Sequence, residues 1–231
     1  MPIAGIVSAA QSLGFYLRLQ EVTANNLANA NSDGYKADRL TAHLVKDQPH
    51  AVPVETTDLA QGSLRETGRP LDLALEGSGY FVVGTAQGER LIRGGSMHLD
   101  GDSRLTDAHG NPVLGEDGPL VLNGSHVEVQ RDGLIVVDGS VAGKLRLVDV
   151  EDPKSLRKEG YGKFVSTETP HPVDDGKLSI RQGAVEDANL DPVLSMVDLV
   201  AIQRAYSASA DCVRSLDGVL GTITNEVGRV Q

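Results

Sequence analysis

The chain has 231 residues, enough for one large domain or two modest ones with a sizeable apolar core. Its 21 Lys and Arg against 32 Asp and Glu give a formal net charge of -11, which disfavours nucleic acid and anionic lipid surfaces as partners. Aromatic residues make up 3% with no Trp, so base-stacking surfaces are not expected, and the single Cys212 excludes an intramolecular disulfide or a multi-cysteine metal site.

The first twenty residues lack a basic segment ahead of the apolar ones, and Gln11 and Arg18 interrupt the apolar pattern. This composition differs from that of a secretory signal peptide. No apolar run approaches the roughly 20 residues that span a bilayer, so we expect no direct membrane insertion. If the chain is exported, we expect a route that needs no cleaved signal.

The N-terminal segment has the apolar spacing of an amphipathic helix. Residues at alternating steps of three and four form an apolar series with one polar break, and these are Ile3, Ile6, Ala10, Leu13, Leu17, Gln20, Ala24 and Leu27. The series predicts a helix over about residues 3–28, roughly 40 Å long. The asparagines that follow weaken a helix because their side chains compete for backbone groups, and Gly34 suits a left-handed stop.

The C-terminal segment repeats this pattern over a greater length. Asp191 and Pro192 are favourable residues at the N-cap and at the first helical position. The apolar series beyond them consists of Leu199, Ile202, Tyr206, Ser209, Val213, Leu216, Leu220, Ile223, Val227 and Val230. We expect a helix of about 35 residues, roughly 50 Å long, and such a length indicates a coiled coil or a partner.

The middle of the chain consists of short apolar runs separated by turn pairs such as Asp132-Gly133 and Asp138-Gly139, which predicts antiparallel β structure. We expect Asp72 and Glu76 on the solvated face of one strand. The predicted fold class is therefore α+β, in which two terminal helices form a discontinuous, coiled-coil-like α domain around an inserted all-β domain. The expected segments are residues 1–40 (helix and turn), 41–57 (linker), 58–185 (β domain) and 186–231 (C-terminal helix).

The sequence offers no set of catalytic, cofactor-binding or metal-ligating residues. The histidines show no i, i+4 metal spacing, and Ser78 precedes a strand where a nucleophile elbow would need a helix. The loop with Asp100, Asp102 and Asp107 has Arg104 where a calcium loop needs an oxygen ligand, so we interpret it as a solvated hairpin turn. We do not expect an enzyme.

The segment TANNLANANSDGYKAD (residues 23–38) contains Asn-Leu-Ala-Asn, followed by a glycine, an aromatic and a basic residue. It is the first of four segments that resemble the flagellar axial proteins, the family of rod, hook and hook-associated proteins. The others are RPLDLALEGSGYFVV (69–83), RGGSMHLDGDSRLTDAHGNPVLG (93–115) and residues 182–225, the last with Met196, Gln203, Arg204 and Tyr206. Two departures are Gly94, where Asn is common, and Ser207, where Glu often follows the aromatic residue.

The resemblance implies a structural subunit of the basal-body rod, whose copies stack into a hollow shaft that transmits torque and passes export substrates. Implied partners are copies of itself, other proximal-rod proteins, the distal-rod protein and the flagellar export apparatus, in the periplasmic rod. The expected assembly residues are Ile6, Leu13, Leu17, Asn26, Leu27, Asn29, Tyr35, Asn189, Met196, Gln203, Arg204, Tyr206, Val213, Leu216, Leu220 and Ile223. Phe15 and Leu19 resemble an export signal of early axial subunits, with simple packing as the alternative.

Within the family, the short region 44–62 and the absence of a basic residue near the first turn favour the proximal-rod type, next to the distal rod, over the distal-rod type. Two alternatives belong to other classes. One is a β-domain enzyme with helical oligomerisation arms, which lacks a candidate catalytic set. The other is a plain coiled-coil adaptor, against which the family-like turns of the β domain argue.

Overall fold

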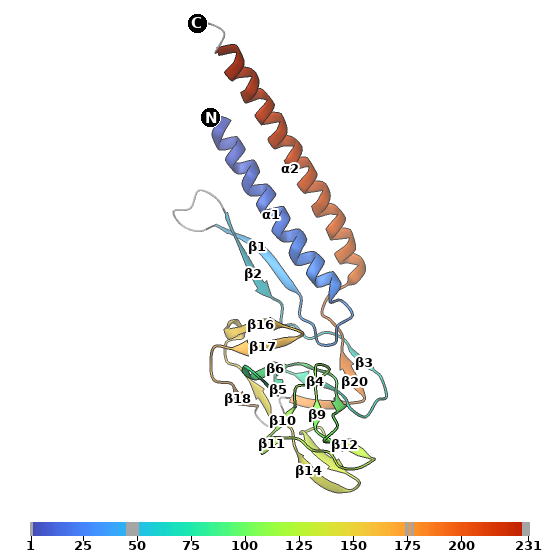
Figure 1. Cartoon of the computed structure of the whole chain (residues 1–231). Coiled ribbons are helices and arrows are strands. Elements are labelled where there is room, and N and C mark those ends of the chain that lie inside the picture. The colour runs from blue at the N-terminus through green and yellow to red at the C-terminus, as the bar shows by residue number, and fades with distance from the viewer. Residues whose placement is uncertain (1, 45–50, 174–175, 177, 228–231) are drawn as a thin grey trace. The chain divides into compact units, whose positions relative to one another are not determined.

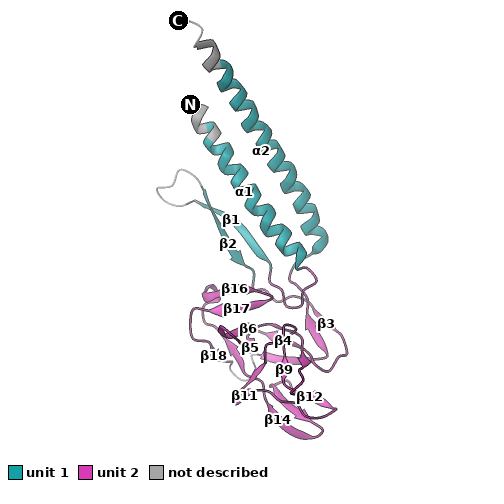
Figure 2. Ribbon diagram, in the orientation of Figure 1, with its two compact units in different colours: residues 1–29, 37–58, 190–231 teal, residues 30–36, 59–189 magenta. Residues whose placement is uncertain are grey.

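The computed structural model describes residues 2–44, 51–173, 176 and 178–227 (Figure 1). The chain divides into two compact units (Figure 2). The α unit consists of residues 1–29, 37–58 and 190–231, and the β unit of residues 30–36 and 59–189. Terminal helices with a β-rich centre confirm the α+β class.

The α unit contains two long helices and a β-hairpin. Helix α1 (Pro2–Ala28) and helix α2 (Pro192–Val227) lie side by side, and strand β1 (Asp38–Leu44), which pairs with β2 (Ala51–Thr57), packs along α1 (Figure 1). Neither helix, over its described residues, has a stretch long and apolar enough to cross a membrane.

Both helix ends follow the capping chemistry that the sequence predicts. At the start of α2, Asp191 Oδ1 accepts hydrogen bonds from the amides of Val193 at 2.8 Å and Leu194 at 3.2 Å. At the end of α1, Asn29 Nδ2 donates to the carbonyl of Asn25 at 2.9 Å. Gly34 has the predicted positive φ of 66°, although it lies in the loop beyond the helix and not at its last turn.

The region 41–57 is not the linker that we expected. Its described parts are strands, paired antiparallel with Asp38 opposite Thr57 and Ala42 opposite Pro53. Most of β2 is exposed on both faces, so its residues do not alternate between buried and exposed. Without this alternation, the sequence carries no apolar pattern that would predict the strand. A proline is tolerated here, since each strand of a two-stranded ribbon is an edge.

The β unit is built from antiparallel sheets, as predicted. The largest has the order β16 (Leu156–Gly160), β17 (Lys163–Ser166), β6 (Gly88–Ile92), β5 (Tyr80–Thr85), β15 (Leu147–Asp149) and β18 (His171–Pro172). A second sheet has the order β19 (Leu178–Gln182), β4 (Asp72–Gly77) and β7 (Gly94–Ser96), and a third β12 (Val127–Val129), β13 (Leu134–Val137) and β14 (Ser140–Lys144).

Smaller pairs complete the β unit. They are β3 (Leu64–Glu66) with β20 (Ala184–Glu186), β8 (His98–Leu99) with β9 (Leu105–Thr106), and β10 (Leu114–Gly115) with β11 (Gly118–Pro119). A short 3-10 helix, η1, covers Pro153–Ser155.

Strand β5 lies between two apolar cores. Phe81 and Val83 belong to the larger core, which also holds Leu73 of β4, whereas Tyr80 and Val82 pack in a smaller core with Phe164. Successive side chains of a strand point to opposite faces, so a strand buried on both sides contributes to both cores. This explains why the segment YFVVG is continuously apolar.

One polar residue of β4 does not lie where we expected it. Asp72 is buried, with only 3% of its side chain exposed, whereas Glu76 is exposed as predicted. Asp72 Oδ2 accepts hydrogen bonds from Thr67 Oγ1 at 2.5 Å and from Arg69 Nε at 2.8 Å. These donors compensate the carboxylate for lost water, which makes burial tolerable.

Candidate functional site

Helix α1 has two protected faces. The first recurs at steps of four, three and four and consists of Phe15, Leu19, Val22 and Asn26. This face is turned toward the hairpin, because Asn26 bonds to Asp38 at the start of β1. Arg18, beside the same face, also donates to Glu55 of β2 at 2.6 Å. Phe15 and Leu19 are therefore half-buried beside the hairpin.

The second face of α1 is turned toward α2. Its half-buried residues are Leu13, Tyr16, Gln20, Thr23 and Leu27. A Cβ atom on Gly5 would lie 3.9 Å from Leu216 Cδ1 of α2, which places Leu216 on the surface that meets α1. The described residues of the predicted α2 series are all half-buried or buried, namely Leu199, Ile202, Tyr206, Ser209, Val213, Leu216 and Leu220.

Several expected assembly residues lie outside these faces. Leu17 is 49% exposed and Met196 is 53% exposed, and Gln203 and Arg204 are exposed as well. The single apolar series that we assumed for α1 did not include the face that packs beside the hairpin. Because the protected residues lie on the hairpin face and on the α2 face, Leu17 is left in solvent. The side chains of Ile6 and Ile223 lie outside the described part of the chain.

The start of α2 carries an exposed apolar patch that the sequence series did not identify. Val193, Leu194, Val197 and Val200 are 68%, 62%, 60% and 50% exposed, and Met196 lies among them. Residues 193–200 span slightly more than two helical turns, and the sequence shows them as an apolar-rich start of the helix, but these side chains fall outside the three-four series. Five large apolar side chains in eight residues form a surface suited to contact with another protein chain.

The signature loop after α1, residues 30–36, belongs to the β unit. The amide of Gly34 donates to the carbonyl of Glu186 at 2.6 Å, and the amide of Asn189 donates to the carbonyl of Tyr35 at 3.3 Å. Lys158 Nζ lies 3.8 Å from the centre of the Tyr35 ring, a cation–π contact. Tyr35, which we expected on an assembly surface, is only 4% exposed and thus serves the fold of one chain.

The asparagines of the signature mostly make bonds within the chain. Asn29 Nδ2 donates to Asn25, and Asn26 bonds to Asp38, both inside the α unit. Asn189 Nδ2 donates to the carbonyl of Ala60 at 3.1 Å in the β unit. Asn26 and Asn29 are half-buried, so part of each side chain remains accessible.

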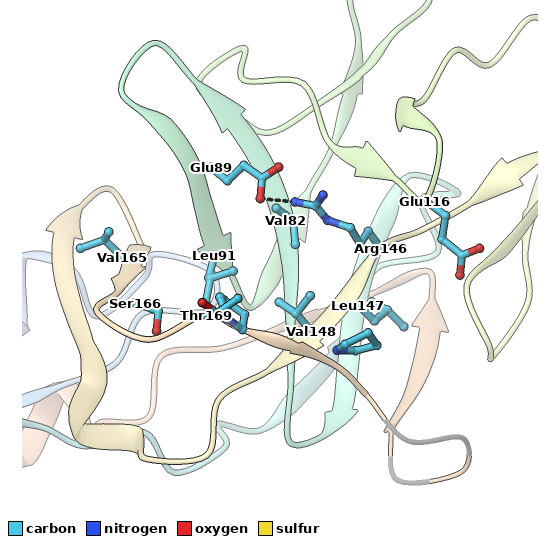
Figure 3. A pocket seen from close by; sticks show the side chains of 12 residues that line it. Val82, Glu89, Leu91, Glu116, Arg146, Leu147, Val148, Val165, Ser166 and Thr169 are labelled. Atoms are coloured by element: carbon cyan, nitrogen blue, oxygen red, sulfur yellow. Dashed lines mark ion pairs between the residues drawn. The ribbon is translucent and has the colours of Figure 1, made fainter.

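A pocket of about 490 Å³ lies against the largest sheet of the β unit (Figure 3). Val82, Leu91 and Val148 form apolar lining, and an ion pair joins Arg146 to Glu89. Among the described residues that line the pocket, no histidine or cysteine could activate the hydroxyls of Ser166 and Thr169. Across the described part of the chain, no group of three or more His, Cys, Asp or Glu could hold a metal ion.

Comparison with known proteins identifies both chain ends. Residues 17–36 match the family described as "Flagella basal body rod protein", and residues 181–226 match "Flagellar basal body rod FlgEFG protein C-terminal". The flagellar basal-body rod protein FlgF of Mesorhizobium japonicum is 31% identical over 208 residues, which cover 85% of this chain and 86% of the relative.

The chain belongs to the family of flagellar basal-body rod proteins. FlgF of Escherichia coli is 31% identical, with 89% of this rod protein and 90% of the relative covered. FlgG of Bacillus subtilis is 24% identical, with 89% and 92% covered. This rod protein is a structural subunit of the basal-body rod, assembled with other rod proteins, and not an enzyme.

Proposed function

We propose that this rod protein is a proximal-rod subunit, next to the distal rod. The observation that carries the proposal is its greater similarity to FlgF relatives, at 31% identity, than to the FlgG relative of Bacillus subtilis, at 24%. The alternative is a distal-rod subunit of the same family. The short region 44–62 favours the proximal type.

The subunit polymerises through its terminal helices, which extend into a coiled-coil-like seam with neighbouring copies. Leu17 and Met196 are exposed in one chain and thus available for such contacts, as are Gln203 and Arg204. The remaining members of this assembly surface are Ile6, Leu13, Asn26, Leu27, Asn29, Asn189, Tyr206, Val213, Leu216, Leu220 and Ile223. The apolar patch at the start of α2 joins it, because burial of each large apolar side chain contributes about 2 kcal/mol.

The partners of the subunit are further copies, other proximal-rod proteins, the distal-rod protein and the flagellar export apparatus. It is exported without a cleaved signal peptide into the periplasmic rod, and the tube that it helps to form transmits torque and passes export substrates. Phe15 and Leu19 serve in export recognition. Their half-buried position beside the hairpin means that they become accessible when the hairpin moves away from α1 or before the chain folds.

Motility tests the structural assignment. In a strain that lacks the native gene, Leu216→Asp should be exported at normal levels and yet abolish swimming, because an unpaired carboxylate is costly on an apolar helix face. Deletion of residues 1–29 should also abolish assembly. The control is Asp102→Asn, whose carboxylate is 76% exposed, and it should swim normally. An exported but immotile Asp102→Asn beside a motile deletion of residues 1–29 would favour the enzyme with helical arms.

Electron microscopy of basal bodies tests the position in the rod. Without a proximal subunit, basal bodies should lack the distal rod as well, because the distal subunits then have no completed proximal rod on which to assemble. Without a distal subunit, the proximal rod should still be present. A complete proximal rod in the deletion strain would therefore overturn the proximal assignment and support the alternative.

A further inference from the structure

Glu186, the last residue of β20, lies at the centre of a buried group of charges. Its side chain is 0% exposed, that of Lys36 is 0% exposed and that of Arg93 is 5% exposed. Oε1 accepts from Lys36 Nζ and from the amide of Gly62 at 3.0 Å. Oε2 accepts from Arg93 Nε at 3.2 Å, and Arg93 Nη2 lies 3.1 Å away. We call Lys36, Arg93 and Glu186 the junction cluster.

Both cations of the junction cluster also bind backbone carbonyls of other segments. Lys36 Nζ donates to the carbonyl of Ala60 at 2.7 Å. Arg93 Nη1 donates to the carbonyls of Gly77 at 2.9 Å and Gly79 at 2.5 Å. The Glu186 carboxylate thus pairs with both Lys36 and Arg93. Through these two cations it connects the segment after α1, the segment after β2 and the turn between β4 and β5.

The position of the junction cluster along the chain is the observation that decides its role. The chain passes between the α unit and the β unit after residues 29, 36, 58 and 189. Lys36 is the last residue before the second passage, Ala60 and Gly62 follow the third, and Glu186 precedes the fourth. At three of the four points where the chain passes from one unit to the other, the adjoining segment of the β unit therefore contributes to the junction cluster.

We propose that the junction cluster is a conformational clamp, with Glu186 as its central member, that locks together the three β-unit segments through which the chain enters and leaves that unit. Backbone bonds reinforce it, since the amide of Gly34 donates to the carbonyl of Glu186 and that of Asn189 to the carbonyl of Tyr35. Opening any of these segments exposes or unpairs a buried charge. The clamp acts within one chain and does not depend on the rod assignment.

The three charges are not equivalent. Removal of Lys36 leaves a neutral buried pair of Arg93 and Glu186, whereas removal of the Glu186 charge leaves two cations buried without their carboxylate. A buried charge that loses its partner is strongly destabilising, while loss of both members of a pair costs much less. We therefore expect Glu186→Gln to be the most damaging variant, and Lys36→Met to recover part of its loss in the double variant.

Calorimetry and amide hydrogen exchange on the full chain test the clamp. Glu186→Gln should lower the Tm of the β unit by roughly 10 °C, and Lys36→Met/Glu186→Gln should melt above Glu186→Gln. The matched control is Glu66→Gln on the paired strand β3, where the carboxylate is 75% exposed and bonded to Arg181, and its Tm should change by less than about 2 °C.

Lys36→Met keeps the test decisive if Glu186→Gln does not fold. This variant should fold, and the amides of Gly34, Gly62 and Asn189 should exchange at least about tenfold faster, while amides of β5 keep their protection. A Tm of Glu186→Gln within about 2 °C of Glu66→Gln would overturn the clamp. Unchanged exchange at Gly34, Gly62 and Asn189 in Lys36→Met would overturn it as well.

Discussion

Asn26 and Asp38 form a double hydrogen bond that joins the last turn of α1 to the first residue of β1. Asn26 Nδ2 donates to the carbonyl of Asp38 at 2.8 Å, and Asn26 Oδ1 accepts from the amide of Asp38 at 2.9 Å. A side-chain amide both donates and accepts, so it pairs with an extended backbone residue as a neighbouring strand would. This pairing gives the signature asparagine a role inside one chain.

Asn26→Asp should loosen the hairpin from α1. The new carboxylate still accepts from the amide of Asp38, but it places an oxygen against the carbonyl that Nδ2 satisfied, at a cost of about 1–2 kcal/mol. Amides of β1 and β2 should exchange about tenfold faster. Asn31→Asp, on an exposed residue of the loop, is the control and should leave them unchanged. Equal protection in both variants would contradict the proposed importance of this pairing.

Gly94→Ala should destabilise the β unit severely. Gly94 has a φ of 119°, and a Cβ atom there would lie 2.3 Å from the carbonyl oxygen of Leu73, on the strand paired with β7. Strain and overlap together should cost about 3 kcal/mol or more, measured by urea unfolding. Gly101→Ala is the control, because no atom lies within 4 Å of its Cβ position. A Gly94→Ala chain as stable as the control would show that the backbone can adjust here.

Asp72 should make stability depend on pH at the acid end. Burial raises the pKa of its carboxyl, but hydrogen bonds from Thr67, Arg69 and Ser96 outweigh burial and hold the pKa below the ordinary 3.8. The folded chain therefore keeps Asp72 ionised to lower pH than the unfolded chain does. Its contribution is present above about pH 4 and is lost as the pH falls through the lowered value.

Asp72→Asn removes this contribution. At pH 7 it should lower the free energy of unfolding by about 1–2 kcal/mol, and the difference from the natural chain should shrink as the pH falls below about 4. Asp117→Asn, at an exposed carboxylate, is the control, and both should be measured by urea unfolding at several pH values. A constant difference across that range would mean that the charge of Asp72 does not stabilise the fold.

Leu216→Asp should separate α1 from α2 within one chain. Leu216 contacts α1 at Gly5. An aspartate at this position removes the apolar contact that leucine makes, and glycine has no side chain that could donate a hydrogen bond to the new carboxylate. Amides of α1 should then exchange about tenfold faster, while those of β5 keep their protection. Ser215→Asp puts the same charge on the exposed side of α2 and should have little effect. Similar exchange in the two variants would mean that Leu216 does not support the pairing.

Local patterns were enough to predict the helices and the β-rich centre. The alternation of three and four steps and the Asp191-Pro192 cap predicted α2, and the start observed at Pro192 confirms them. The signature around Asn26 and Tyr35 was enough to indicate the family, which the similarity to FlgF relatives confirms. These features are encoded by residues close in sequence, so propensity, capping and periodicity report them directly.

Residue patterns were enough to predict the class of each segment and the family to which the chain belongs. The contacts between segments became visible only in the folded chain: α1 has two protected faces because a hairpin packs beside it, and Asp72 is buried because Thr67 and Arg69 reach it. The junction cluster is the clearest case, since Lys36 and Glu186 are 150 residues apart. No local sequence pattern predicts such a pair. A charged residue is expected in solvent, and only the folded chain provides the partner that compensates it for the loss of water.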